Sequence, residues 1–232
     1  MSNCAIAGNM LPLVRLLQLA SPALPIGGFS YSQGLEWVVA EGVVTDAASA
    51  QTWIGDALDL VMARGEAPIA WRLLAAVNRD WPSFARWNAW FGASRETSEL
   101  RSETEQMGGS LAKLALDLGL VDASAQAAMA AGAPMTLPAA FALAACAFAV
   151  PPDAALAAYV WTWLENQVLC AMKLVPLGQV AGQRMLTALG SRIPEVVATA
   201  MVLADDELST FAPGIALASA RHETQYTRLF RS

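Results

Sequence analysis

The sequence predicts an all-α protein, and three observations support that prediction. Apolar residues recur at intervals of three and four along most of the chain, as in Leu13, Leu16 and Leu17. Proline and glycine stand at the joints between these segments. No segment combines polar–apolar alternation with β-branched side chains, the pattern typical of strands. With 232 residues, no internal repeat and no low-complexity linker, we expect a single domain of about ten helices in a compact bundle.

Apolar periodicity and capping residues place the helices in order along the chain. Gly42 can end the second helix, Thr45 or Asp46 can cap the third, and Pro68 can open the fourth. Residues 121–136 are rich in alanine and predict a connection or a weak helix. The expected helices cover residues 13–20, 30–42, 46–61, 68–79, 82–91, 94–118, 139–150, 153–175, 177–189, 194–203 and 216–223.

The loop at residues 21–36, SPALPIGGFSYSQGLE, makes unusual demands on the backbone. Pro25 fixes its own φ, and Gly27 and Gly28 permit turns or close approaches that a side chain would obstruct. Ser30 can cap a helix, and Gln33 completes the S-x-x-Q form of a capping box, so we expect a helix to begin at Ser30. The glycines lack the spacing of a phosphate-binding loop, so a tight helix–loop–helix junction is favoured.

Composition limits the classes of partner. The chain is 56% hydrophobic and only 15% charged, which predicts surfaces that are buried against other proteins. Its net charge of −6 and the lack of a basic run argue against nucleic acid as a partner.

A membrane span is not expected, although residues 123–152 carry no charge. Four prolines interrupt that stretch, and its longest clean helix, residues 139–150, is too short for a bilayer and fits a buried core helix. Residues 1–11 lack a basic segment followed by a long apolar one, so no signal peptide is expected either.

Few residues in the chain are suited to chemistry. The three cysteines, Cys4, Cys146 and Cys170, are widely spaced and predict reduced, buried thiols in a cytosolic protein. His222 is the one histidine, and a structural or interface role is favoured over a ligand role. We therefore predict no catalytic, cofactor-binding or metal site within one chain. A metal site shared by two copies stays open, because symmetry doubles a single ligand.

The longest predicted helix carries alternating charge over residues 95–105, and a solvated face is favoured over a docking surface. Farther along it, Gly108, Gly109 and Ser110 offer small side chains where another helix could approach closely.

The tail, residues 221–232, mixes arginine with aromatic and apolar side chains, as the centres of interfaces do. We predict a helical domain at 1–220 and a partner-binding tail that is loose alone and ordered by a partner. A tail packed on its own core remains an equally good alternative. The tail residues expected to bind are Arg221, His222, Glu223, Gln225, Tyr226, Arg228, Leu229 and Phe230.

Three blocks of this sequence closely resemble the UreF family of urease accessory proteins. They are LASPALPIGGFSYSQGLEW at residues 19–37, MKLVPLGQVAGQR at 172–184 and ASARHETQYTRLFRS at 218–232. The blocks cover about a fifth of the chain in the family's order, and the charged RETSELRSETEQ at 95–106 is similar to the family's long helix.

The resemblance implies an all-α homodimer that acts in the cytoplasm in urease maturation. Proteins of this family bind the accessory protein UreD, also called UreH, and recruit and regulate the GTPase UreG on apo-urease, where nickel is inserted. The family's GTPase-facing positions match Glu36, Lys173 and Gln179, and its UreD-binding segment matches the tail from Arg221 onwards.

Two functional classes remain after this resemblance. The first is a scaffold without catalytic activity, cofactor, nucleic acid or membrane partner, in which a residue such as Lys173 gates the GTPase. The second is a dimeric nickel-carrying metallochaperone with shared ligands from His222 and the cysteines.

Overall fold

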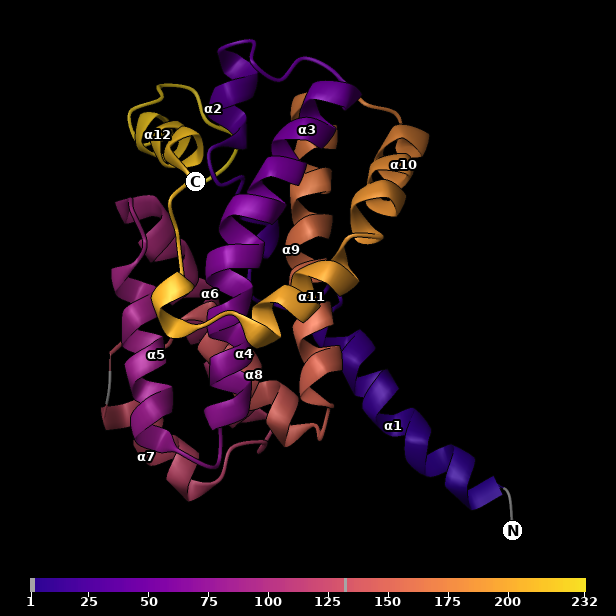
Figure 1. Cartoon of the computed structure of the whole chain (residues 1–232), viewed down its shortest axis with the longest axis vertical. Helices are drawn as coiled ribbons and strands as arrows, with labels where there is room; N and C mark the ends of the chain where they lie inside the picture. Colours follow the sequence, from indigo (N-terminus) through magenta and orange to yellow (C-terminus); the bar gives the residue numbers. More distant parts are fainter. Residues whose placement is uncertain (1–2, 132) are drawn as a thin grey trace.

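The computed structural model describes residues 3–131 and 133–232, and within them it is helical without a strand. The prediction of one all-α domain is confirmed (Figure 1). The α-helices are α1 (Asn3–Leu19), α2 (Leu35–Ala40), α3 (Ala47–Ala57), α4 (Ala67–Ala76), α5 (Trp81–Ala93), α6 (Ser98–Asp117), α7 (Ala123–Ala131), α8 (Leu137–Ala147), α9 (Pro152–Leu174), α10 (Gln179–Gly190), α11 (Ile193–Val202) and α12 (Pro213–His222). A π-helix, η2 (Leu58–Glu66), and two 3₁₀ turns, η1 (Gly28–Ser30) and η3 (Asp205–Glu207), complete the described chain.

The core is built around α8, as expected of the uncharged stretch. All of its alanines except Ala147 are buried between α4, α6 and α9, because small side chains let these helices pack closely. Gly108 of α6 is needed for this contact, since a Cβ there would lie 2.2 Å from the carbonyl oxygen of Met135. The close approach predicted for Gly108 is therefore confirmed, whereas a Cβ on Gly109 would meet nothing within 4 Å.

Pro68 does not separate two helices, contrary to the sequence-based expectation. The third and fourth predicted helices form one continuous run through α3, η2 and α4. Proline normally clashes with the carbonyl four residues earlier. Here the run has π-helical register just before Pro68, and Ala67 donates to the carbonyl of Met62, five residues earlier. The wider turn accommodates the proline and places Glu66 at the end of η2.

The apolar face predicted for the first helix is only partly buried. Leu19 is buried, but Leu13 and Leu17 are exposed, Leu17 by 63%. Figure 1 shows the reason: α1 extends away from the other helices, and its contacts are with α8 and α9. From Met10 onwards this helix therefore presents several apolar side chains to solvent.

The helix expected to begin at Ser30 begins at Leu35 instead. Ser30 ends the short turn η1, and Gln33 and Gly34 have φ of 53° and 81°, so the predicted capping box does not form. Gly34 is required for two reasons: its φ is left-handed, and a Cβ would lie 2.8 Å from the backbone nitrogen of Ser219 in α12. This contact brings α12 against the start of α2.

One stretch, Gln179–Val202, is long enough and apolar enough to cross a membrane. It is two helices, because the chain turns at residues 191–192 between α10 and α11. Both helices pack on the bundle, α10 against α3 and α9, and α11 against α4 and η2.

Candidate functional site

The tail is packed on the body of the protein, so the expectation that it is loose in the isolated chain is wrong. His222 is fully buried and Phe230 is 5% exposed. The expected boundary at residue 221 falls inside α12, whose last residue is His222. The alternative of a tail packed on its own core is the observed arrangement, and Figure 1 shows α12 and the tail beside α2. We call the residues that hold the tail, namely Glu36, Glu99, His222 and Arg228, the tail cluster.

Glu36 is the centre of the tail cluster, although it was expected on an exposed surface facing a GTPase. It is 7% exposed, in the first turn of α2. Its Oε1 accepts from the backbone N–H of Leu229 at 2.6 Å, and its Oε2 accepts from that of Phe230 at 2.9 Å. One carboxylate thus satisfies two consecutive backbone donors of the tail, in place of the hydrogen bonds that regular structure would supply.

His222 lies between two carboxylates. Its Nε2 is 3.1 Å from Oε2 of Glu36 and its Nδ1 is 2.7 Å from Oε2 of Glu99. Carboxylate oxygens are acceptors only, so both ring nitrogens donate when the imidazole is protonated. Arg228 also pairs with Glu99, with its Nη1 2.6 Å from Oε1 of that carboxylate. The structural role favoured for His222 is the role that this geometry supports.

The charged start of the long helix is solvated only in part: Arg101 is exposed, as expected, whereas Glu99 and Glu103 contact the tail. Glu223 caps α6: its Oε1 accepts from the N–H of Ser98 at 2.8 Å and from that of Glu99 at 3.2 Å. Hydrogen bonds from Ser98, with backbone bonds from α6, lower the pKa of Glu223. The Thr97 and Ser219 hydroxyls also share a hydrogen bond of 2.7 Å.

The other two positions expected on the GTPase-facing surface are exposed. Lys173, near the end of α9, has Nζ 5.5 Å from the ring centroid of Phe230, a cation–π contact with the tail. Gln179 is exposed at the first position of α10, and its side chain forms no hydrogen bond with the described residues. The structure therefore brings Glu36 and Lys173 to the tail, but not Gln179.

The tail has a buried face and an exposed one. His222 and Phe230 point inward, whereas Arg221 and Arg228 are exposed. Tyr226 is fully exposed, and Leu229 is 68% exposed. Gln225 is half-buried and donates to the backbone carbonyl of Thr227 at 2.9 Å. Large apolar side chains presented on a rigidly held segment are typical of a protein-binding surface.

The loop at residues 21–36 lies between the tail and a cavity. Gly27 has a φ of 77°, as the turn expected there requires, while Pro25 is exposed and Gly28 and Ser30 are half-buried. Gln33 faces the bundle: its Nε2 donates to Glu103 and its Oε1 accepts from the indole N–H of Trp163, both at 2.8 Å. Gln33 is therefore a link to the cavity instead of a helix cap.

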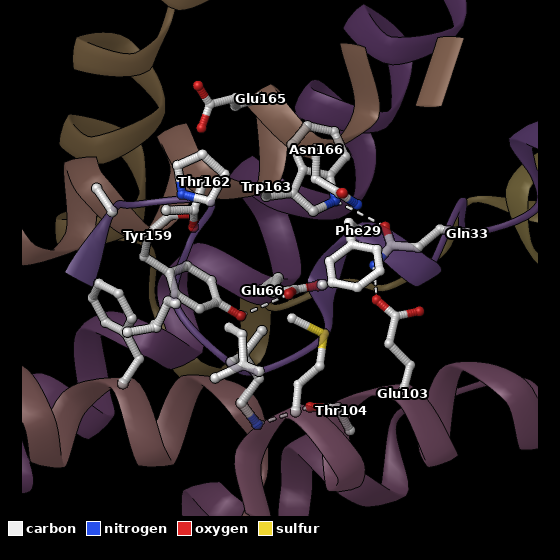
Figure 2. Close-up of a pocket in the computed structure, with 18 of the residues that line it drawn as sticks. Phe29, Gln33, Glu66, Glu103, Thr104, Tyr159, Thr162, Trp163, Glu165 and Asn166 are labelled. Carbon is white, nitrogen blue, oxygen red and sulfur yellow. Dashed lines mark hydrogen bonds between the residues drawn. The ribbon is translucent and has the colours of Figure 1, made fainter. Parts of the chain in front are cut away.

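A cavity of about 120 Å³ lies between this loop, α6, α8 and α9, and Figure 2 shows its lining. A second group of buried charges, Glu66, Arg95 and Glu103, contributes to the wall, and we call it the cavity cluster. Glu66 accepts from the Tyr159 hydroxyl at 2.8 Å and is 3.2 Å from Nη1 of Arg95. Burial raises the pKa of Glu103 to about 7, and it raises the pKa of Tyr159 as well.

The sequence analysis missed the cavity cluster. Arg95 and Glu103 were counted in a solvated face, and Glu66 was passed over inside an apolar helix. A signal was present: Glu66 and Arg72 are the charged residues in the otherwise apolar stretch 65–78, and a charge at a core position calls for a buried partner. The partners of Glu66, Arg95 and Tyr159, are 29 and 93 residues away in sequence, so no local pattern identifies them.

The residues suited to metal binding are dispersed. The described residues contain no group of three or more His, Cys, Asp or Glu side chains that could hold a metal ion. Cys170 is buried and Cys146 half-buried, both as free thiols, and burial raises the pKa of Cys170 to about 12. Cys4 lies outside the described side chains.

Comparisons with known proteins agree with this fold and these motifs. The sequence profile of the UreF family matches residues 44–190. The urease accessory protein UreF of Azoarcus sp. is 56% identical over 97% of this chain and 98% of its own length. UreF of Bordetella parapertussis is 57% identical over 93% of this chain and 100% of its own length. The bifunctional urease accessory protein UreEF of Bordetella bronchiseptica is 54% identical, and this chain spans 56% of its length. The chain belongs to the UreF family of urease accessory proteins.

Proposed function

We propose that this protein is a scaffold for urease maturation that performs no bond-making step of its own. It binds a UreD/UreH-type accessory protein through the tail and recruits and regulates a UreG-type GTPase during nickel insertion into apo-urease. The observation that carries the proposal is the exposed face of the tail, where Tyr226 and Leu229 are held in solvent by the buried Glu36 and His222 beneath them. An anchored apolar surface loses little conformational entropy when a partner covers it.

The bifunctional relative supports a role in an assembly. Its name, UreEF, indicates that two urease accessory functions are joined in one chain. A fusion of this kind suits proteins that work side by side, and it agrees with the excess of exposed apolar side chains here.

For the GTPase we propose regulation by an exposed charge next to the tail. Lys173 is exposed and touches Phe230, so its position depends on whether the tail is docked. A lysine is a point charge without the planar fork of an arginine finger, so gating is favoured over insertion into the nucleotide site. Glu36 acts indirectly, by fixing the tail, and Gln179 extends the exposed surface at α10.

We also propose that the protein works as a homodimer in the cytoplasm. The apolar ridge of α1, formed by Met10, Leu11, Leu13, Val14 and Leu17, is the face that a second copy would cover. Light scattering on the full chain tests this proposal: a dimer that dissociates in Leu13→Asp/Leu17→Asp supports it, and a monomeric wild type contradicts it.

The tail proposal is tested by capture of the full chain on an immobilised UreD/UreH-type protein. Tyr226→Ala/Leu229→Ala removes the exposed apolar face without touching the tail cluster, so binding is expected to fall at least tenfold. The matched control is Val202→Ala, another exposed apolar residue that lies on α11. Equal binding by the double variant and the wild type would contradict the proposal.

The dimeric nickel carrier finds no support in this geometry. Both ring nitrogens of His222 face carboxylates of the same chain, so neither is available to a metal while the tail is docked. Equilibrium dialysis with nickel separates the two functions: tight binding that disappears in His222→Ala would favour the carrier over the scaffold.

A further inference from the structure

The carboxylates that hold the tail lie beneath it. Glu36 and Glu103 are buried, and Glu99 is half-buried. Glu36 accepts hydrogen bonds from two backbone N–H groups of the tail, and Glu99 pairs with His222. Glu103 accepts from the Ser232 hydroxyl at 2.8 Å. The negative charge in contact with the tail is therefore directed at its inner side.

The cations of the tail lie on its outer side. Arg221 and Arg231 are both exposed. Lys173, which lies beside the tail with its Nζ 5.5 Å from the ring centroid of Phe230, is exposed as well. Arg228 is also exposed, although it shares its charge with a carboxylate of the tail cluster. The outer side of the tail is therefore positively charged.

This charge is opposite to that of the rest of the chain. Residues 221–232 contain three arginines and one glutamate, a net charge of +2 with His222 counted as neutral. The whole chain has a net charge of −6, so residues 1–220 carry −8. A positive patch on an otherwise acidic protein attracts acidic groups to the patch, while the remaining surface repels them. An acidic partner is thereby restricted to orientations in which it faces the tail.

We propose, resting on the scaffold function above, that the tail docks on a protein surface that carries acidic side chains around an apolar pocket for Tyr226. Tyr226 is fully exposed, and an aromatic anchor at the centre of an interface with charges at its rim is a common arrangement. Arginine pairs with carboxylates through two parallel hydrogen bonds, which adds orientation to attraction. Nucleic acid and anionic lipid fit less well, because the few cations of the tail are surrounded by an acidic protein.

The test measures how fast the full chain associates with an immobilised UreD/UreH-type protein at two ionic strengths. At about 0.01 M the Debye length is about 30 Å, and at about 0.15 M it is about 8 Å. Arg221→Glu/Arg231→Glu reverses two exposed charges, so the association rate is expected to fall about tenfold at the lower ionic strength and less at the higher one. The matched control is Arg79→Glu/Arg86→Glu, which makes the same change of net charge at exposed positions before and within α5. It is expected to leave the rate close to that of the wild type.

A second variant separates the charge from the docking of the tail. The backbone N–H of Arg231 donates to the carbonyl of Ser30 at 2.7 Å, so a change at this position also affects how the tail is held. Arg221→Glu alone lies in the last turn of α12, and it is expected to lower the association rate about threefold. Hydrogen exchange at Phe230 shows whether the tail stays docked in both variants.

The outcomes distinguish this proposal from the scaffold function. If Arg221→Glu and the double reversal associate as fast as the wild type, while Tyr226→Ala/Leu229→Ala does not bind, the charge proposal is overturned and the scaffold function stands. If the wild type itself does not bind, both are overturned. Saturable binding of the wild type to phosphatidylserine vesicles or to a DNA duplex, lost in the double reversal, would assign the positive patch to phosphate groups and overturn the acidic protein surface.

Discussion

The tail cluster and the cavity cluster use the same ingredients and differ in completeness. Each places two carboxylates beside at least one cation, in the interior of the bundle for the cavity cluster and at its edge for the tail cluster. In the tail cluster, the nitrogens of His222 and the oxygens of Glu36 have partners. In the cavity cluster, two N–H groups of Arg95 have none among the described residues.

This difference separates two kinds of buried charge. A network that is satisfied within the chain makes its own part of the structure rigid, and here that part is the tail. A network that leaves buried donors without partners keeps an uncompensated desolvation cost. The first cluster therefore holds the tail in one shape, whereas the second is a place where the folded structure is held at a cost in stability.

The largest expected effect comes from breaking the tail cluster at its centre. Glu36→Gln leaves His222 with a single carboxylate and turns an amide N–H toward a backbone N–H of the tail. A hydrogen bond to a charged group is worth about 1.5–3 kcal/mol, and Glu36 accepts two from the tail backbone, so the two together are worth about 3–6 kcal/mol. Release of the tail limits the loss to the lower part of that range. Urea unfolding measures the stability, and hydrogen exchange at Leu229 and Phe230 reports the docking.

Glu41→Gln is the matched control for that experiment, because Glu41 is exposed at the end of the same helix. It is expected to change the free energy of unfolding by less than about 0.5 kcal/mol. Unchanged exchange protection of Leu229 and Phe230 in Glu36→Gln would show that the tail is held by other contacts.

The next effect separates backbone strain from steric exclusion at the base of the tail. Gly34→Ala places a Cβ 2.8 Å from the backbone nitrogen of Ser219 and forces a side chain into a φ of 81°. Gly42→Ala introduces only the unfavourable backbone conformation, because φ of Gly42 is 73° and a Cβ there would meet nothing within 4 Å. We expect a loss of about 1 kcal/mol for Gly42→Ala and about 2–4 kcal/mol for Gly34→Ala. Equal losses in thermal unfolding would show that α12 moves aside at little cost.

Local patterns in the sequence were enough for most of the fold. Caps, prolines and apolar spacing predicted the helices of the core, because each is a property of neighbouring residues. The failures occurred where tertiary structure overrides a local preference. Pro68 continues a helix because the preceding turn is π-helical, and Gln33 adopts a positive φ because its side chain is bonded to Glu103 and Trp163.

The candidate site was predictable in its parts and not in its arrangement. The resemblance indicated Glu36, Lys173 and the tail as functional, but nothing local shows that Glu36 accepts two hydrogen bonds from residues nearly 200 positions away. The charges of residues 95–105 have the composition of a solvated helix. Arg95 and Glu103 are nevertheless buried, because the rest of the bundle and the tail pack on them, whereas Glu96 and Arg101 stay exposed.

A smaller effect is expected in the cavity cluster, from the titration of Glu103. The pKa of Glu103 is raised from its ordinary 4.5 to about 7, so between these values the folded protein holds a proton that the unfolded chain has lost. The free energy of unfolding therefore falls as pH rises through this window, by at most about 1.4 kcal/mol per pH unit, and this contribution is constant above it. The slope is expected to disappear in Glu103→Gln, measured against wild type in urea at several pH values. The same slope in both proteins would place the titration elsewhere.

The smallest structural effect tests whether a contact of the tail can matter for function without mattering for stability. Lys173→Ala removes an exposed cation–π contact with Phe230, which is worth about 0.5–1 kcal/mol at such a site. Exchange at Phe230 is expected to rise only slightly. If Lys173 gates the GTPase, hydrolysis and urease activation in the assembled complex change far more than this energy accounts for, because the lost charge acts on the partner. Unchanged hydrolysis and activation, with the tail still docked, would show that Lys173 only makes a weak contact with the tail. The exposed face around Tyr226 would then be the candidate for the regulatory role.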